Sequence, residues 1–62
     1  MNYTLTKGNI KYQVRFLAEN VEVTRDVSGT VDTSKQVMTK TEGTRFVNER
    51  IREGFKAKTT QN

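Results

Sequence analysis

Three basic residues near the end of the chain have the spacing that one side of a helix requires: Arg45, Arg52 and Lys56. At roughly 100° per residue they cluster about 120° from the centre of an apolar stripe. This stripe consists of Val47, Ile51 and Phe55. If the stripe docks on a sheet, the basic row faces outward and can bind phosphates, because each neutralised phosphate releases condensed counterions. The alternative is a solvated row with ordinary ion pairs, since Glu49 lies among the three bases.

A second row of polar side chains alternates with apolar ones in residues 10–16 and consists of Lys11, Gln13 and Arg15. Two-stranded ribbons that read a major groove use such alternating side chains, so Lys11 and Arg15 are further candidates for nucleic-acid contacts. The expected neighbouring strand places Glu22 opposite Arg15 and Asp26 opposite Lys11. Cross-strand pairs of opposite charge stabilise a sheet and repel phosphate, which favours a structural role for this row.

Phe46 and Arg50 are the candidate interface residues. Phe46 lies about 140° from the centre of the apolar stripe, so a helix that docks through the stripe leaves this ring exposed. An exposed aromatic ring indicates a contact with a second copy of the chain or with a protein partner. The alternative is a wider buried face that also includes Phe46 and Ala57.

Groups suited to catalysis or metal binding are scarce. The sequence has no His and no Cys, which removes the commonest general base, the strongest nucleophile and the usual zinc ligands. Its four glycines are isolated, so no phosphate-cradling loop is present. Glu49 and Glu53 each have a basic neighbour at helical spacing, which is typical of a solvated face. We therefore expect no enzymatic activity, no catalytic residues, no metal site and no cofactor.

The size of the chain limits its core. Its 62 residues, of which 32% are hydrophobic, are enough for one small domain spanning 1–62. Domains this lean usually need disulfides, a metal or a partner subunit, and without Cys and His a partner subunit is what remains. We therefore expect a homodimer.

The formal net charge of +4 is unevenly distributed. Residues 1–17 carry three bases and no acid, 18–36 carry two bases and four acids, and 37–62 carry six bases and three acids. Two positive ends predict a nucleic acid or an acidic protein surface as partner. No segment has the apolar pattern of a signal peptide or of a membrane span, so we expect no membrane association and a cytoplasmic location, in the host cytoplasm if the protein is viral.

The range 1–27 has the alternation of an antiparallel β-meander, with strand patterns around residues 3–5, in 10–16 and in 21–27. A four-residue connection after Phe16 places Phe16 opposite Val21 and Ile10 opposite Val27, which gathers the apolar side chains on one face. By the same reasoning Leu5 stands opposite Ile10, with a turn at residues 6–9.

Residues 28–43 are an uncertain connection or a fourth strand. A short helix capped by one of residues 32–34 is one interpretation, and the alternation of Val37, Thr39 and Thr41 favours a strand.

Residues 44–58 have the period of an amphipathic helix, with Gly54 inside it where the helix approaches the sheet closely. Residues 59–62 are expected to form a frayed tail.

Residues 43–53 resemble the second helix of ribbon-helix-helix DNA-binding proteins. That family needs a strand and a well-formed first helix upstream, whereas residues 28–43 are rich in threonine and poor in apolar residues. The resemblance therefore supplies an alternative architecture and no site residues.

Together these patterns predict an α+β fold, in which a three- or four-stranded antiparallel β-meander is followed by one C-terminal amphipathic helix. The expected function is that of a small basic accessory or regulatory protein that binds nucleic acid through phosphate contacts from this helix. The alternative is a protein–protein interaction module, such as a small inhibitor or adaptor of viral or plasmid type, acting as a homo-oligomer.

Overall fold

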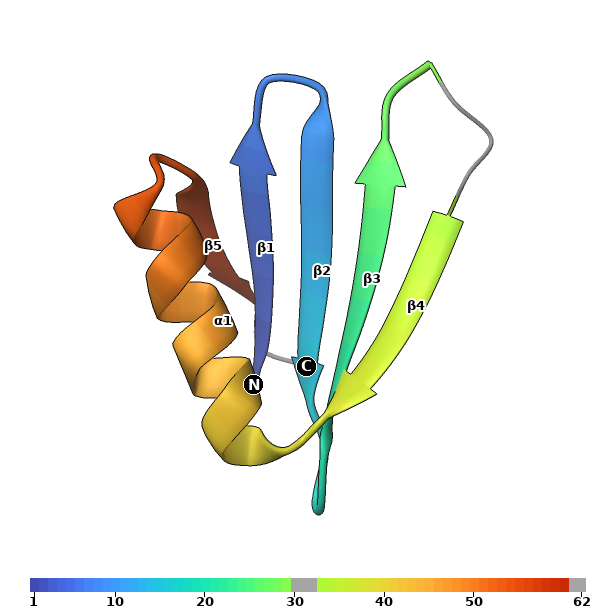
Figure 1. The fold of residues 1–62 in the computed structure, drawn as a ribbon, viewed down its shortest axis with the longest axis vertical. Helices are drawn as coiled ribbons and strands as arrows, with labels where there is room; N and C mark the ends of the chain where they lie inside the picture. Colours follow the sequence, from blue (N-terminus) through green and yellow to red (C-terminus); the bar gives the residue numbers. More distant parts are fainter. Residues whose placement is uncertain (30–32, 61–62) are drawn as a thin grey trace.

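The computed structural model of the chain describes residues 1–29 and 33–60. The strands in this part are β1 (Asn2–Lys7), β2 (Ile10–Phe16), β3 (Val21–Val27), β4 (Thr33–Met38) and β5 (Lys56–Thr60), and the helix is α1 (Lys40–Arg52). The strands form one antiparallel sheet in the order β4-β3-β2-β1-β5 (Figure 1).

The fold is α+β, with one antiparallel sheet and one helix, as predicted. The sheet has five strands rather than three or four, and the helix lies in the middle of the chain rather than at its end. The ribbon-helix-helix alternative is wrong, because the single helix of the described residues follows four strands. Of the three residues considered as caps of a short helix, residue 32 lies outside the described residues, and residues 33 and 34 belong to β4.

The register of β2 against β3 is confirmed. Phe16 stands opposite Val21 and Ile10 opposite Val27, and the four-residue connection is closed by a hydrogen bond from the Leu17 N–H to the Asn20 carbonyl (2.8 Å). This register places the apolar side chains of both strands on one face, and that face can then be buried as a whole.

The register of the first hairpin differs from the prediction by two residues. Leu5 stands opposite Tyr12, not Ile10, and the pair of Lys7 with Ile10 leaves only Gly8 and the next residue in the turn. Gly8 has φ +58, the positive value that the first position of a tight II′ hairpin turn requires. A shift by two residues keeps every side chain on its predicted face, because side chains alternate with a period of two.

The helix begins four residues earlier than predicted. Thr39 is its N-cap, and the Thr39 hydroxyl accepts a hydrogen bond from the backbone N–H of Glu42 while the Glu42 carboxylate accepts one from the backbone N–H of Thr39. This reciprocal capping box satisfies two N–H groups that a helix start otherwise leaves without partners. The helix therefore runs through Gly43, which the prediction placed before it.

The helix ends at Arg52, six residues earlier than predicted, because Gly54 is its C-terminal stop. Gly54 has φ +108, and its N–H donates to Ile51 O while the N–H of Phe55 donates to Arg50 O, both at 3.0 Å. These two bonds form a Schellman motif, which reverses the chain after a helix.

The reversed chain continues as β5, which pairs with β1. The prediction of helix through residue 58 is therefore wrong, as is that of a frayed tail at 59 and 60. Residues 61 and 62 lie outside the described residues.

One face of the sheet, here called the inner face, carries α1, and the other is called the outer face (Figure 1). Among the described residues, six side chains form the buried core: Leu5, Val14, Val21, Val23, Val47 and Phe55. The helix approaches the sheet at the buried Gly43, where an added Cβ would lie 2.6 Å from a Val21 methyl group. The core thus lies between α1 and the strands β1, β2 and β3.

Candidate nucleic-acid interface

The structure divides the five predicted nucleic-acid contacts between two surfaces. Lys11 and Arg15 lie in β2 and Lys56 lies in β5, whereas Arg45 and Arg52 lie in α1. The three basic residues expected on one helix face therefore do not come together.

The sheet residues point to the outer face. Leu5 and Val14 are fully buried on the inner face, so their sequence neighbours point away from it. Lys56 and Lys58 stand opposite Thr6 and Thr4 of β1, and residues that stand directly opposite one another share a face. The outer face of β2, β1 and β5 thus carries four cations, here called the basic platform: Lys11, Arg15, Lys56 and Lys58.

The three strands of the basic platform contain no acidic residue. Lys11, Thr6 and Lys56 form one cross-strand row, and Lys58 is two residues beyond Lys56. With strands about 4.8 Å apart, the Cα atoms of Lys11 and Lys56 are about 10 Å apart, and those of Lys56 and Lys58 about 7 Å. Three lysines therefore lie close together on a surface that also carries Thr4 and Thr6.

The acidic residues of the outer face lie on the neighbouring strand β3. Glu22 forms ion pairs with Arg15 (Nη1–Oε1, 3.9 Å) and with Lys35 of β4 (Nζ–Oε2, 3.4 Å). The predicted pairing of Arg15 with Glu22 is confirmed. Lys11 stands opposite Asp26, but within residues 1–29 and 33–60 no ion pair or hydrogen bond engages the ammonium groups of Lys11, Lys56 or Lys58.

The helical surface is less favourable to phosphate. Arg45 and Arg52 line a shallow depression on the outward side of α1 together with Glu49, and Glu42 lies one turn before Arg45. Alternating signs along one face partly cancel at the distance of a bound polyanion. The outward side of α1 therefore places its cations among carboxylates. The three strands of the basic platform carry four cations and no acidic residue, and the nearest carboxylates, Glu22 and Asp26, lie on the adjacent strand β3.

Phe46 is half-buried, which contradicts an exposed ring and agrees with the alternative of a wider buried face. Ala57, which that alternative also included, lies in β5 and is exposed. The Phe46 ring packs edge-on against Tyr12 with centroids 5.0 Å apart, and the Arg50 guanidinium lies over it at 4.9 Å. Ile51, predicted to dock, is instead 47% exposed. The face that meets the sheet runs from Gly43 through Phe46 and Val47, which turns Ile51 toward solvent.

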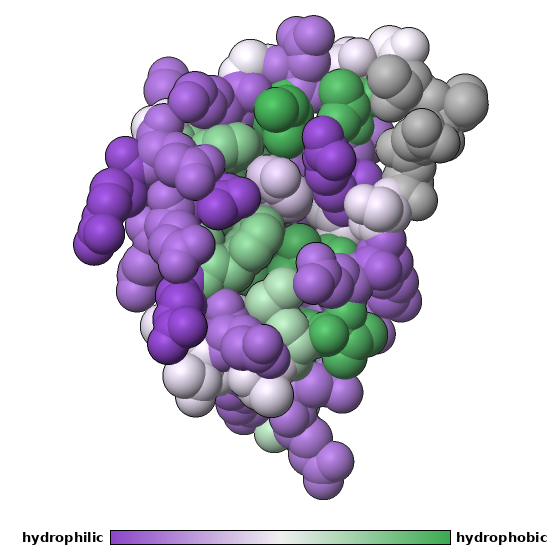
Figure 2. All heavy atoms as spheres, viewed as in Figure 1, coloured by the Kyte–Doolittle hydropathy of each residue, from purple (hydrophilic) through white to green (hydrophobic). Residues whose placement is uncertain are grey.

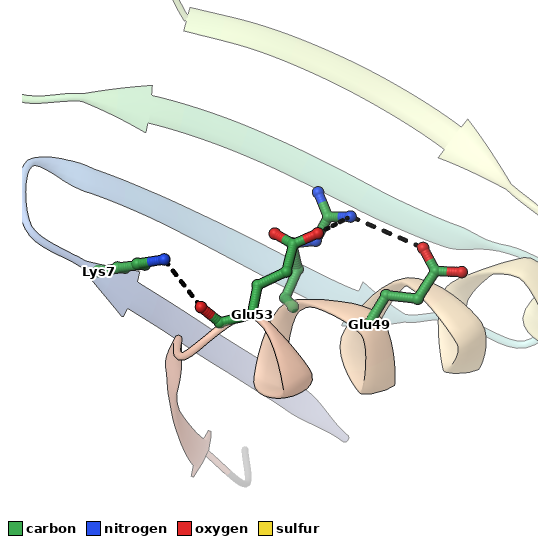
Figure 3. Close-up of polar contacts among 4 residues, drawn as sticks. Lys7, Glu49 and Glu53 are labelled. Carbon is green, nitrogen blue, oxygen red and sulfur yellow. Dashed lines mark hydrogen bonds and ion pairs between the residues drawn. The ribbon is translucent and has the colours of Figure 1, made fainter.

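Arg50, the other predicted interface residue, forms ion pairs with two glutamates at the end of α1. Its Nη2 lies 3.1 Å from Glu53 Oε2 and 3.6 Å from Glu49 Oε2 (Figure 3). In the same view Lys7 reaches from β1 to donate a hydrogen bond to the Glu53 carbonyl at the end of α1 (2.8 Å). A cation there satisfies a terminal carbonyl and complements the helix dipole.

Lys58 is the residue of the basic platform that the sequence prediction missed. The alternation of Lys56, Ala57 and Lys58 is a strand signal, but it was interpreted as the end of a helix. Gly54, two residues before Lys56, is the feature of the sequence that indicates the end of the helix.

The described residues contain no group of three acidic side chains that could hold a metal ion. In the same part of the chain no helix is long and apolar enough to cross a membrane. Comparison with protein-family models, with curated proteins and with solved structures finds no match for this chain.

Proposed function

We propose that this protein binds nucleic acid in an accessory or regulatory role, through phosphate contacts from the basic platform. The supporting observation is the gathering of Lys11, Arg15, Lys56 and Lys58 on three adjacent strands that carry no acid. The proposal keeps the nucleic-acid partner expected from the sequence and moves the contact surface from the helix to the sheet.

Phosphate is the group that such a surface favours. A duplex carries one negative charge per about 1.7 Å of its axis, both strands counted, so a 10 Å stretch carries about six phosphates, of which about three belong to each strand. Lysine stems are long and flexible, which lets each ammonium group reach a phosphate without an exact match of spacing. Since three of these ammonium groups have no protein partner within the described ranges, binding phosphate would break no existing ion pair of theirs.

Base stacking has no part in the proposal, because every aromatic ring of the chain belongs to the core or packs against it: Tyr3, Tyr12, Phe16, Phe46 and Phe55. Proteins that prefer single strands usually stack bases on exposed aromatic rings. We therefore expect little preference among base sequences and a strong dependence on salt. Neutralising three or four phosphates of a duplex gives a slope of about −3 in a plot of log affinity against log salt.

Fluorescence anisotropy with a labelled duplex, a labelled single-stranded DNA and a labelled RNA tests the proposal. The variant Lys11→Gln/Lys56→Gln/Lys58→Gln should lose most of the affinity and reduce the salt slope by about three. A matched control, Lys40→Gln/Arg45→Gln/Arg52→Gln, removes the same charge from exposed positions of α1. This control should retain most of the affinity and most of the salt slope.

Lys11→Gln alone should also weaken binding, since Lys11 is the cation of the platform that lies on a central strand and has no partner. Undetectable binding of the unaltered protein at low salt would refute the proposal. Equal losses in the two triple variants would also refute it, because the net charge alone would then explain the affinity.

The homodimer expected from the lean core stays a prediction. The two edges of the sheet differ: β5 carries Lys56 and Lys58 in five residues, and such charges discourage edge pairing. The other edge, β4, exposes Val37 by 57% and has Lys35 bound to Glu22. We expect β4 to be the strand that pairs in a dimer, which light scattering of the protein and of a Val37→Lys variant would test.

We also expect a cytoplasmic location, in a host cell if the protein is viral, because a nucleic-acid partner is accessible there. Cell fractionation of the tagged protein tests this expectation.

A further inference from the structure

A second candidate binding site lies on the inner face, beside the helix and away from the basic platform. A pocket of about 300 Å³ opens between α1 and β4, and its floor is formed by β2 and β3. The residues that matter to its chemistry are Tyr12, Arg25, Ser34, Gln36, Phe46 and Arg50. Apolar side chains reach the surface between α1 and β4 in Figure 2, so α1 leaves this part of the inner face partly uncovered.

Two guanidinium groups line this pocket. Arg25 interrupts the apolar row of β3 and stands between Tyr12 of β2 and Ser34 of β4, which places it on the inner face. No hydrogen bond or ion pair of its side chain is found among residues 1–29 and 33–60. Arg25 is exposed to solvent and lines the pocket, so its guanidinium is accessible to a ligand.

Arg50 supplies a donor of a different kind. Its Nη2 is bound by Glu49 and Glu53, whose side chains are about half exposed and do not line the pocket. Its Nε is buried and has no hydrogen-bond acceptor in the described part of the chain. Buried donors are nearly always satisfied in folded proteins, so an unsatisfied one calls for an explanation such as a bound group.

We propose that this pocket binds an oxyanion, a phosphate or carboxylate group carried by a small molecule, which accepts hydrogen bonds from Arg50 Nε and from the Arg25 guanidinium. Guanidinium groups match the planar geometry of oxyanions and form their strongest hydrogen bonds with them. The hydroxyl of Ser34 and the amide of Gln36 add neutral donors on the opposite wall. The carboxylates of Glu49 and Glu53 pair with Arg50 Nη2 from outside the pocket lining, so Arg25 is the cation of the pocket that no carboxylate pairs with in the described part of the chain.

The size of the pocket limits the rest of the ligand. A volume of about 300 Å³ is at the lower end of small-molecule sites, which holds an oxyanion and a small body but no extended polymer. The rings of Phe46 and Tyr12, packed edge-on at 5.0 Å, offer an apolar surface to such a body. The site is therefore independent of nucleic-acid binding on the outer face.

Nitrogen–proton correlation spectra that include the arginine Nε–H signals provide the test. Sodium phosphate and sodium acetate are added separately at constant ionic strength, with sodium chloride as the reference. We expect saturable shifts of the Arg50 Nε–H signal and of the Ser34 and Gln36 amide signals. Saturation by phosphate alone identifies a phosphate ligand, and saturation by acetate identifies a carboxylate ligand.

Arg25→Gln should weaken this binding about tenfold or more, the loss expected for one charge-assisted hydrogen bond. Arg45→Gln, which removes an exposed charge outside the pocket, should leave it unchanged. Shifts that grow linearly and equally with chloride would overturn the proposal, as would an unchanged affinity in Arg25→Gln. The triple lysine variant of the basic platform should bind the anion normally, so failure of one proposal is distinguishable from failure of the other.

Discussion

Replacement of Gly43 by alanine tests how closely the helix approaches the sheet. In an ordinary helix position, alanine is more stable than glycine by up to about 1 kcal/mol. At Gly43 the added Cβ would lie 2.6 Å from Val21 Cγ2 and 2.9 Å from both Val21 Cγ1 and Cβ. Val21 is fully buried and β-branched, so its side chain cannot rotate away. The helix would have to move outward.

Overpacking of this kind costs about 1–3 kcal/mol. Contacts as short as these belong at the upper end, so Gly43→Ala should lower the free energy of unfolding by about 2 kcal/mol after the propensity gain is subtracted. Urea denaturation followed by circular dichroism measures this loss. Thr44→Ala, at the adjacent exposed helix position, is the matched control and should gain a few tenths of a kcal/mol.

A double-mutant cycle locates the cause. Val21→Ala alone should cost roughly 2–3 kcal/mol through lost burial and a cavity. In the double variant Gly43→Ala/Val21→Ala, the substitution at Val21 removes the two methyl groups that the new Cβ would contact and leaves the contact with Val21 Cβ. The loss of stability in the double variant should therefore be smaller than the sum of the two single losses by about 1 kcal/mol or more. Stabilisation by Gly43→Ala, or strictly additive effects, would refute the close packing of α1 against β3.

Three further substitutions examine the ends and the face of the helix. Phe46→Ala should lower the free energy of unfolding by about 2–3 kcal/mol, since its ring packs on Tyr12, and urea denaturation would give a near-zero change if the ring were exposed. Gly54→Ala should lower the free energy of unfolding by about 1–3 kcal/mol, because residue 54 has φ +108, which alanine adopts only with strain. A steric clash adds nothing, since an added Cβ would meet only the end of the Lys7 side chain at 3.8 Å. A neutral effect would argue against the C-terminal stop. The hydrogen bond from the backbone N–H of Thr39 holds the pKa of Glu42 below its ordinary value of 4.5. A carboxylate whose pKa is lowered in the folded state stabilises the protein above pH 4.5, and this stabilisation is lost as the pH falls through the pKa of the folded state. Glu42→Gln should therefore flatten the fall of the unfolding free energy with decreasing pH in that range. An unchanged slope would exclude the capping box.

Part of this fold could be predicted because one face of its meander is apolar. In the observed register Val14 stands opposite Val23 and Phe16 opposite Val21, so the apolar residues of β2 and β3 share the inner face, and a shift by one residue would separate them. The first hairpin was predicted two residues out of register, yet its side chains kept their faces because a shift by two preserves the alternation. The core side of β1 and β2 was therefore predictable even where the turn was not.

The helix ends were predicted wrongly for two separate reasons. The capping box of Thr39 and Glu42 is a visible local pattern, but Gly43 directly after it disfavours a helix unless tertiary contact with Val21 requires a missing side chain. At the other end, Gly54 fits either a close approach inside a helix or a stop after one. Only the position of Phe55, buried in the core after the reversal, decides for the stop.

The candidate site was harder to predict, because it depends on a pairing between the two ends of the chain. Lys56 and Lys58 join Lys11 only through the alignment of β5 with β1, in which Ala57 stands opposite Leu5 and Lys56 opposite Thr6. No local pattern carries such a long-range contact.

The lysines of β5 also have a simpler explanation, since charged residues on an edge strand prevent sheets from pairing with one another. This explanation accounts for Lys56 and Lys58 on the edge strand, but not for Lys11, which lies on the central strand β2 with both neighbours paired. Its ammonium group also stands opposite Asp26 without forming an ion pair with it in the part of the chain that is described. The two explanations therefore make different predictions for Lys11. A loss of nucleic-acid affinity in Lys11→Gln supports a phosphate-binding surface, whereas an unchanged affinity supports lysines that only prevent edge pairing.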